Sequence, residues 1–373
     1  MVKIVADNNI PFLRGALEKF AGVIYFPGRE IGHEIVNDAD ALIVRTRTKC
    51  NGKLLGGTPV KYIATATIGF DHIDADYCSL QGIRWSNAPG CNSGSVMQYV
   101  ASALAFISGS DGRKFGELTL GIVGVGHVGK KVEGLARALG MRVMLNDPPR
   151  ERLEGAGGFV DLGRLLEGSD IVTIHVPLNR EGADRSFHLA DKGFFSRMKK
   201  GSWFINSSRG EVMNTDALKG ALRNGHLAGT VIDVWENEPD IDRELLLMAD
   251  IATPHIAGYS LDGKANGTAQ SVRAVSNFFG LEIGDWYPEI PAPVDQTINI
   301  ETNHSECDQL IQKLFKHTYD ITADSARLKA NPEYFERLRD DYPPRREFGA
   351  YRLKFDDIAD PVVEKMHELG FRI

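Results

Sequence analysis

A glycine-rich segment between an apolar run and an amphipathic run constrains the fold of this chain more than any other feature. The segment GIVGVGHVG places Gly124, Gly126 and Gly129 in a GxGxxG spacing. In such a loop the first glycine allows a tight turn, the second lets an anion approach the backbone, and the third lets the helix pack closely. Because LTLGIV is typical of a strand and residues 128–140 of a helix, we interpret the segment as a dinucleotide-binding turn.

The end of the next predicted strand indicates which dinucleotide is bound. Asp147 ends the run RVMLND, near the spacing of roughly 20 residues at which an acidic residue reaches the ribose. A carboxylate there binds both ribose hydroxyls of NAD and repels an added 2′-phosphate. The alternative is an ordinary turn residue before Pro148–Pro149. We predict NAD as the cofactor, with His127 and Val128 of the glycine loop also in its site.

Short apolar runs alternate with helical periodicity along most of the chain. This alternation predicts an α/β fold of two doubly wound parallel sheets. A helical period at Phe12–Phe20 separates the first two strands, and Leu261–Phe279 is predicted to be one long helix. Pro288, Pro291 and Pro293 then form a stiff connector to a further unit. The predicted strands are VKIVA, ALIVRT, VKYIATA and IRWSNAP in the first sheet, and LTLGIVGVG, RVMLND, DIVTIHVPL, GSWFINSSRG, GTVIDVWE and DIATPHIAG in the second.

Composition excludes several classes of protein. With 373 residues the chain is too long for one ordinary core. Its formal charge of −7 leaves no general basic surface for nucleic acid, so we expect no nucleic-acid partner. No apolar run is long enough to span a membrane, and MVKIVADNN lacks the apolar core of a secretory signal. The four cysteines are scattered, which favours reduced thiols in the cytoplasm, and no cluster has metal-ligand spacing.

Three polar residues follow three successive strands of the second predicted sheet. They are Arg209 in INSSRG, Glu238 in DVWENEP and His255 in TPHIAG. Carboxyl ends of parallel strands share one edge, where ligands bind. A histidine suits proton transfer, a carboxylate orients the imidazole, and an arginine binds an anionic substrate. Each residue alone has an ordinary structural explanation as a turn or loop residue, but together behind an NAD motif they predict a catalytic site.

These segments together resemble the D-isomer-specific 2-hydroxyacid dehydrogenase family, over residues from about 40 to 280. The resemblance implies Arg209 as substrate-binding residue, Glu238 as partner of the histidine, and His255 as acid/base. It also implies a flavodoxin-like substrate-binding lobe from residues 1–98 and 256–287, and a Rossmann NAD-binding lobe from residues 99–255.

Further segments, among them VRTRTK, TATIGFDHID and HIAGYSLDGKANGT, are similar to family members that oxidise 4-phospho-D-erythronate at carbon 2 in vitamin B6 biosynthesis. Those members carry an extra C-terminal unit, which implies a smaller α+β dimerisation domain over residues 288–373 and a homodimer. The resemblance implies substrate contacts for Thr46, Thr67 and Tyr259. Threonine 46 stands where serine is expected, and Val176 where threonine is expected. The implied cofactor site contains Asp147, Val176, Ser207, Ser208, Arg209, Asp233 and Gly258.

A phosphorylated 2-hydroxy acid needs cationic partners, and two basic clusters are available. We expect Arg45 of VRTRTK and Arg346 of YPPRREF to bind substrate, although these arginines could instead pair with nearby acids. Three alternatives to this function stay open. The chain could oxidise another acid such as phosphoglycerate or glycerate, act as a non-enzymatic NAD-binding regulator, or serve as a structural oligomer with vestigial cofactor binding.

Overall fold

The computed structural model describes residues 1–300, 307–356 and 360–373. The chain divides into two compact units. The first unit contains Met1–Asn92 and Ser260–Pro291, and the second contains Ser93–Tyr259 and Ala292–Ile373. Within the described residues, no helix combines the length and the apolar character needed to cross a membrane.

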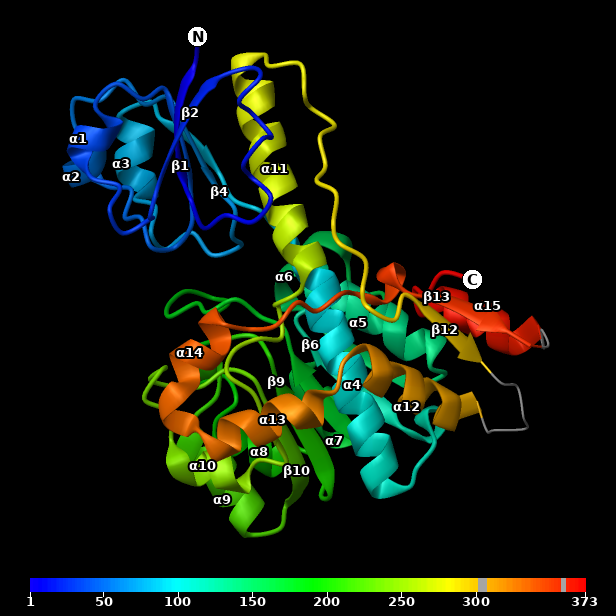
Figure 1. Ribbon diagram of the computed structural model, residues 1–373. Coiled ribbons are helices and arrows are strands. Elements are labelled where there is room, and N and C mark those ends of the chain that lie inside the picture. Colours follow the sequence, from blue (N-terminus) through cyan, green and yellow to red (C-terminus); the bar gives the residue numbers. More distant parts are fainter. Residues whose placement is uncertain (301–306, 357–359) are drawn as a thin grey trace. The chain divides into compact units, whose positions relative to one another are not determined.

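The first unit is built on a five-stranded parallel sheet in the order β2-β1-β3-β4-β5. This is the flavodoxin-like strand order, which confirms the predicted fold class. Figure 1 shows α1, α2 and α3 on one side of the sheet and the long helix α11 on the other. The ring of Phe278 on α11 lies 4.6 Å from that of Tyr62 on β4. The elements are β1 (Lys3–Asp7), β2 (Gly22–Phe26), α1 (His33–Val36), β3 (Ala41–Val44), α2 (Gly52–Leu55), β4 (Tyr62–Thr65), α3 (Ala75–Leu80), β5 (Arg84–Ser86) and α11 (Leu261–Phe279).

The helix predicted at Phe12–Phe20 is wrong, and strand β2 was not predicted. The segment is a series of turns, with left-handed φ values of 63° at Phe12 and 86° at Gly15. Two such residues cannot continue a right-handed helix. Leu13 and Leu17 are fully buried, so their helix-like spacing reflects burial of an irregular segment.

The second unit contains a six-stranded parallel sheet in the order β11-β10-β9-β8-β6-β7. The strand order reverses between β6 and β8, as expected for the predicted Rossmann-type lobe. Helix α4 was not predicted, because the sequence reasoning placed no element between the two sheets. The elements are α4 (Ser93–Asp111), β6 (Thr119–Val123), α5 (His127–Ala138), β7 (Arg142–Asn146), α6 (Pro148–Glu154), α7 (Leu162–Gly168), β8 (Ile171–Ile174), α8 (Lys192–Arg197), β9 (Ser202–Asn206), α9 (Thr215–Arg223), β10 (Leu227–Ile232), α10 (Arg243–Met248) and β11 (Ile251–Ala252).

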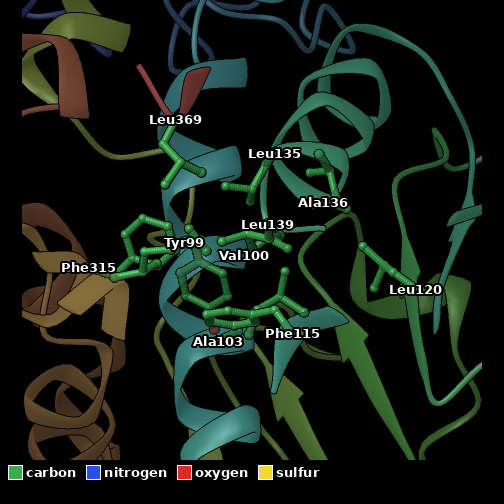
Figure 2. Packing of buried hydrophobic residues seen from close by; sticks show 14 of the residues in the cluster. Tyr99, Val100, Ala103, Phe115, Leu120, Leu135, Ala136, Leu139, Phe315 and Leu369 are labelled. Atoms are coloured by element: carbon green, nitrogen blue, oxygen red, sulfur yellow. The ribbon is translucent and has the colours of Figure 1, made fainter. Parts of the chain in front are cut away.

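The C-terminal residues complete the core of the second unit. Phe315 packs with Tyr99 and Val100 of α4 in one buried cluster, and Leu369 belongs to the same cluster (Figure 2). Helix α12 contacts α4, and α13 contacts β11. The strand that follows α13 and α14 pairs in parallel with β12. The C-terminal elements are β12 (Thr297–Ile300), α12 (Cys307–Thr318), α13 (Ile321–Ala330), α14 (Phe335–Asp340), β13 (Arg352–Phe355) and α15 (Asp360–Glu368).

Candidate active site

The glycine loop connects β6 to α5 by close backbone contacts. Gly124 has a φ of 88°, and a side chain there would lie 2.7 Å from the carbonyl oxygen of His175. A side chain at Gly129 would overlap the carbonyl oxygen of Gly124. Around Gly126, by contrast, no atom lies within 4 Å of the position of an added Cβ. The first and third glycines are therefore required for packing, and the second leaves room above the loop.

The residues around this loop fit a dinucleotide. Gly126 is the N-cap of α5 and has no side chain that could accept from the helix amides. The first N–H groups of the helix are therefore available to a pyrophosphate. Asp147 accepts hydrogen bonds from the amides of Val125 at 2.7 Å and Arg150 at 3.0 Å, which fix its carboxylate beside the loop. The hydroxyl of Ser207 is buried and has no hydrogen-bond partner among the described residues. A bound cofactor would give these groups partners.

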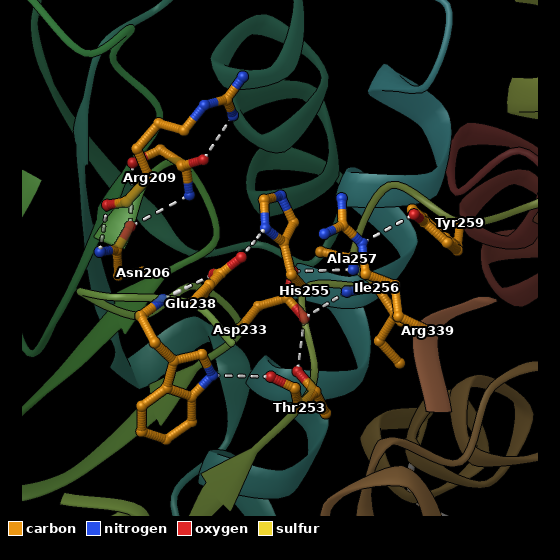
Figure 3. Close-up of polar contacts among 12 residues, drawn as sticks. Asn206, Arg209, Asp233, Glu238, Thr253, His255, Ile256, Ala257, Tyr259 and Arg339 are labelled. Carbon is orange, nitrogen blue, oxygen red and sulfur yellow. Dashed lines mark hydrogen bonds and ion pairs between the residues drawn. The ribbon is translucent and has the colours of Figure 1, made fainter. Parts of the chain in front are cut away.

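The catalytic candidates follow three neighbouring strands. Arg209 follows β9, Glu238 follows β10 and His255 follows β11, so all three lie at one edge of the sheet. His255 donates from Nδ1 to Oε2 of Glu238 at 2.7 Å (Figure 3). The other carboxylate oxygen of Glu238 accepts the amide of Trp235 at 2.9 Å. Both side chains are largely enclosed, at 27% exposure for the histidine and 20% for the glutamate.

The charge of Glu238 is stabilised by this arrangement. Burial opposes ionisation, but the hydrogen bond and charge of His255 outweigh it and lower the pKa of Glu238 below its usual value. The carboxylate is therefore ionised at neutral pH and can only accept a hydrogen bond. It holds a proton on Nδ1 of His255, which leaves Nε2 free to act as a proton acceptor.

The loop that carries His255 is held from beneath by Asp233. The buried carboxylate accepts the amides of Ile256 at 2.8 Å and Ala257 at 2.9 Å, and the hydroxyl of Thr253 at 2.6 Å. His255 itself has a left-handed φ of 57°. Burial raises the pKa of Asp233. The carboxylate of Asp233 thus anchors the histidine loop, a contact that the sequence did not indicate, and its place in the cofactor site stays a prediction.

The C-terminal region holds the same loop from the other side. Arg345 is buried and donates to the carbonyl oxygen of Ala257 at 2.6 Å, and its guanidinium lies 4.3 Å from the centre of the Tyr319 ring. Arg339 donates from Nε to the hydroxyl of Tyr259 at 2.8 Å. Sequence reasoning named Arg345 only as part of a basic cluster and missed Arg339, because no local pattern separates these arginines from surface charges. The backbone oxygen of Arg346 accepts the side chain of Gln98 at 2.9 Å, and its substrate role stays a prediction.

Arg209 extends from the loop after β9. Asn206 shapes this loop, since its side-chain amide donates to the carbonyl oxygen of Arg209 at 3.0 Å and its oxygen accepts the amide of Ser208. The guanidinium is exposed and forms no ion pair among the residues that the structure describes. Val176 borders the glycine loop, because an added Cβ at Gly124 would lie 2.8 Å from its side chain.

The other predicted substrate residues belong to the first unit. Thr46 is exposed in the segment after β3. Arg45 forms a salt bridge of 3.0 Å with the buried carboxylate of Asp7, so pairing with an acid is the arrangement found for this arginine. The hydroxyl of Thr67 donates to the carbonyl oxygen of Gly69 at 2.9 Å. The contribution of these three side chains to a substrate site stays a prediction.

Comparison with known proteins gives consistent results. Residues 105–257 match the family described as D-isomer specific 2-hydroxyacid dehydrogenase, NAD binding domain, and residues 290–370 match a domain of unknown function (DUF3410). The structure of D-lactate dehydrogenase from Aquifex aeolicus, complexed with NAD and lactic acid, superposes with a TM-score of 0.60 at 28% identity, over 74% of this chain and 95% of that one. The TT0316 protein from Thermus thermophilus gives a TM-score of 0.61 at 28% identity, over 79% and 100%. The fold is thus that of NAD-dependent 2-hydroxyacid dehydrogenases, and NAD is the cofactor.

Curated relatives match over nearly the whole chain. Erythronate-4-phosphate dehydrogenase of Bacteroides fragilis is 53% identical over 94% of this chain and 99% of its own length. The enzymes of that name from Porphyromonas gingivalis and Serratia proteamaculans are 43% and 39% identical, over 94% and 99% of this chain and 95% and 99% of their own lengths. The chain therefore belongs to the erythronate-4-phosphate dehydrogenase family, within the D-isomer-specific 2-hydroxyacid dehydrogenases.

Proposed function

We propose that this protein oxidises 4-phospho-D-erythronate at carbon 2 to 3-hydroxy-2-oxo-4-phosphobutanoate, with NAD as acceptor, in pyridoxal phosphate biosynthesis. The observation that carries the proposal is the 2.7 Å hydrogen bond between His255 and Glu238 at the edge of an NAD-binding sheet. The substrate is inferred from the relatives, which are named erythronate-4-phosphate dehydrogenase and match this chain over nearly their full length.

The chain's own residues account for the proton and the substrate carboxylate. NAD, when bound, accepts the hydride from carbon 2. Nε2 of His255 accepts the proton of the 2-hydroxyl as the carbonyl forms, and the carboxylate of Glu238 stabilises the resulting imidazolium through Nδ1. Arg209 offers a fixed charge to the substrate carboxylate and polarises the forming carbonyl oxygen. Asp233 and Arg345 support this step indirectly, because they fix the loop on which His255 lies.

Substrate recognition is assigned to polar side chains named by the resemblance and by their charge. We assign contacts with the acid to Thr46, Thr67, Arg45, Tyr259 and Arg346. The hydroxyl of Tyr259 already accepts a hydrogen bond from Arg339, which orients it. Threonine in place of serine at position 46 keeps a hydroxyl, and Val176 offers only an apolar or backbone contact to the cofactor.

The test is NADH formation by the purified protein. 4-Phospho-D-erythronate, 3-phosphoglycerate and glycerate are supplied side by side, with NAD and with NADP. We expect kcat/KM to be highest for 4-phospho-D-erythronate with NAD, and His255→Ala to lower kcat by at least ~10²-fold while NADH still binds. A higher kcat/KM for either other acid, or no turnover at all, would contradict the proposal.

The assembly and location are part of the same proposal. We assign a homodimer formed through the C-terminal region, because a two-fold dimer is the commonest assembly of soluble homo-oligomers. Light scattering of the full chain should give twice the chain mass of 41.1 kDa. A cytoplasmic location is favoured by the cysteines, since Cys50, Cys78 and Cys307 form no disulfide bond among the described residues.

A further inference from the structure

Arg339 is a half-buried arginine whose only observed partner is a tyrosine. It lies on α14, where Nε donates to the hydroxyl of Tyr259 at 2.8 Å and the guanidinium carbon lies 5.7 Å from the centre of that ring. Across residues 1–300, 307–356 and 360–373, Arg339 forms no other hydrogen bond and no ion pair. The N–H groups of both terminal nitrogens are therefore without a protein acceptor in the described structure.

Two acidic side chains in the segment from α13 to the end of α14 pair with other arginines. Arg327 binds Asp324 at 3.1 Å, and Arg337, two residues before Arg339, lies 3.5 Å from Asp341. Burial disfavours the charge of Arg339, but the neighbouring Tyr259 and more distant carboxylates raise its pKa, so the cation persists. The two terminal nitrogens nevertheless lack an acceptor among the described residues. An anionic ligand would supply that acceptor.

The surroundings of Arg339 place it at the catalytic loop. Tyr259 directly follows the loop that carries His255, and the charge of Arg339 contributes to the lowered pKa of Glu238. In the view of Figure 3 the guanidinium and Glu238 lie on opposite sides of the His255 side chain. Arg339 thus brings a further cation, besides Arg209 and Arg345, to the surroundings of the proton acceptor. It comes from the segment whose family model is a domain of unknown function.

We propose that Arg339 binds the phosphate group of the substrate, with Tyr259 setting the plane of its guanidinium. The inference rests on the proposed function, which gives the substrate two anionic ends. Arg209 is assigned to the carboxylate, and the charge of Arg45 is balanced by Asp7, so a phosphate of about two negative charges can take a further cation besides the contacts assigned above. The hydrogen bond to Tyr259 occupies Nε, which leaves the two terminal nitrogens for phosphate oxygens in the forked geometry that arginine provides.

The test compares two acids in variants of the full chain. Arg339→Met keeps the bulk of the side chain without its charge, Arg339→Lys restores a charge without the fork, and Arg337→Met is the matched control on the same helix. Each protein is assayed with 4-phospho-D-erythronate and with unphosphorylated D-erythronate. We expect Arg339→Met to lower kcat/KM for the phosphorylated acid, mainly through KM, by roughly 10- to 150-fold more than for D-erythronate, because loss of the hydrogen bond to Tyr259 affects both acids alike.

Arg339→Lys should recover part of the loss, and Arg337→Met should behave as the wild type. NADH binding by all variants shows that the second unit is folded. Equal losses for both acids, or no loss, would overturn the assignment and leave Arg339 as a support for Tyr259.

If the wild type oxidises neither acid, the proposed function fails. In that case, calorimetric titration of the NADH-loaded proteins with inorganic phosphate tests the phosphate site independently of turnover. Phosphate binding that only Arg339→Met loses supports the site, whereas absent binding or equal affinity overturns it.

Discussion

Replacement of Glu238 by glutamine would separate the shape of this side chain from its charge. The carboxylate accepts two hydrogen bonds, one from the backbone amide of Trp235 at 2.9 Å and one from Nδ1 of His255 at 2.7 Å. Both partners are donors. A carboxylate accepts both, but an amide has only one accepting atom, so Glu238→Gln cannot satisfy both contacts without a change in the histidine.

Either orientation of the new amide removes the proton acceptor or leaves a donor unpaired. If its oxygen accepts the amide of Trp235, its NH₂ faces Nδ1 of His255, which must then be unprotonated. The proton moves to Nε2, and the ring can no longer accept the substrate proton. In the opposite orientation the NH₂ faces the amide of Trp235, at a cost of about 1–3 kcal/mol for a buried unpaired donor. Both orientations lose the charge that stabilises the imidazolium, so we expect kcat to fall ~10²- to 10⁴-fold.

The chain offers a matched control for this experiment. Glu236 forms a second carboxylate–imidazole pair with Nε2 of His188, also at 2.7 Å, and accepts the amide of Thr215 at 2.9 Å. The exposures of that pair are 21% and 29%, close to those of the first pair. Glu236→Gln should therefore leave kcat within a factor of about 3. NADH binding and the urea midpoint are measured for both variants. A kcat for Glu238→Gln within tenfold of the wild type, or equal losses for both variants, would refute the reasoning.

Three further changes follow from single contacts. Asp147→Ala should reduce the preference for NAD over NADP by at least ~10-fold in kcat/KM, because it removes a charge that repels the 2′-phosphate; an unchanged preference would contradict this. Burial lowers the pKa of His175 to about 3, so only the unfolded chain takes up its proton as pH falls below about 6.5. Wild-type stability should then fall by up to ~1.4 kcal/mol per pH unit more than that of His175→Gln, measured by urea unfolding; parallel profiles would argue against it. Phe348 stacks on two other phenylalanines at 5.0 and 4.8 Å, so Phe348→Ala should cost about 3–5 kcal/mol of unfolding free energy, and a loss under ~1 would be inconsistent with this packing.

The parts of the fold that the sequence predicted are those whose signal is local. Central strands such as β3, β6 and β9 are buried at every residue, so each reads as a short continuous apolar run. The helix at Leu261–Phe279 begins and ends where it was predicted. The glycine loop was recognised because its three glycines lie at a fixed spacing between a strand and a helix. Residues 12–20 failed for the converse reason. Their apolar spacing is helical, but two residues with left-handed φ values interrupt a right-handed helix. The spacing of apolar residues does not reveal a backbone φ.

The residues that hold the loop of His255 in place were not predictable, because they come from distant parts of the sequence. The loop after β11 receives Asp233 from β10, and Arg345 and Arg339 from the C-terminal region. No periodicity links a proline-flanked arginine near the end of a chain to a carbonyl oxygen almost ninety residues earlier. Strand β11, which leads into this loop, is held by α13, where the hydroxyl of Ser325 accepts the amide of Ala252 at 3.0 Å.

These contacts change what the C-terminal region is expected to do. Pairing of two subunits does not require charged side chains against the backbone of the catalytic loop. Arg345 is buried there although two of its nitrogens lack partners among the described residues, a costly arrangement in an interior. Such a cost is retained where it fixes a conformation, and the conformation fixed here includes a left-handed His255. The region from residue 290 onward therefore acts on the position of the proton acceptor, whatever further role it has in assembly.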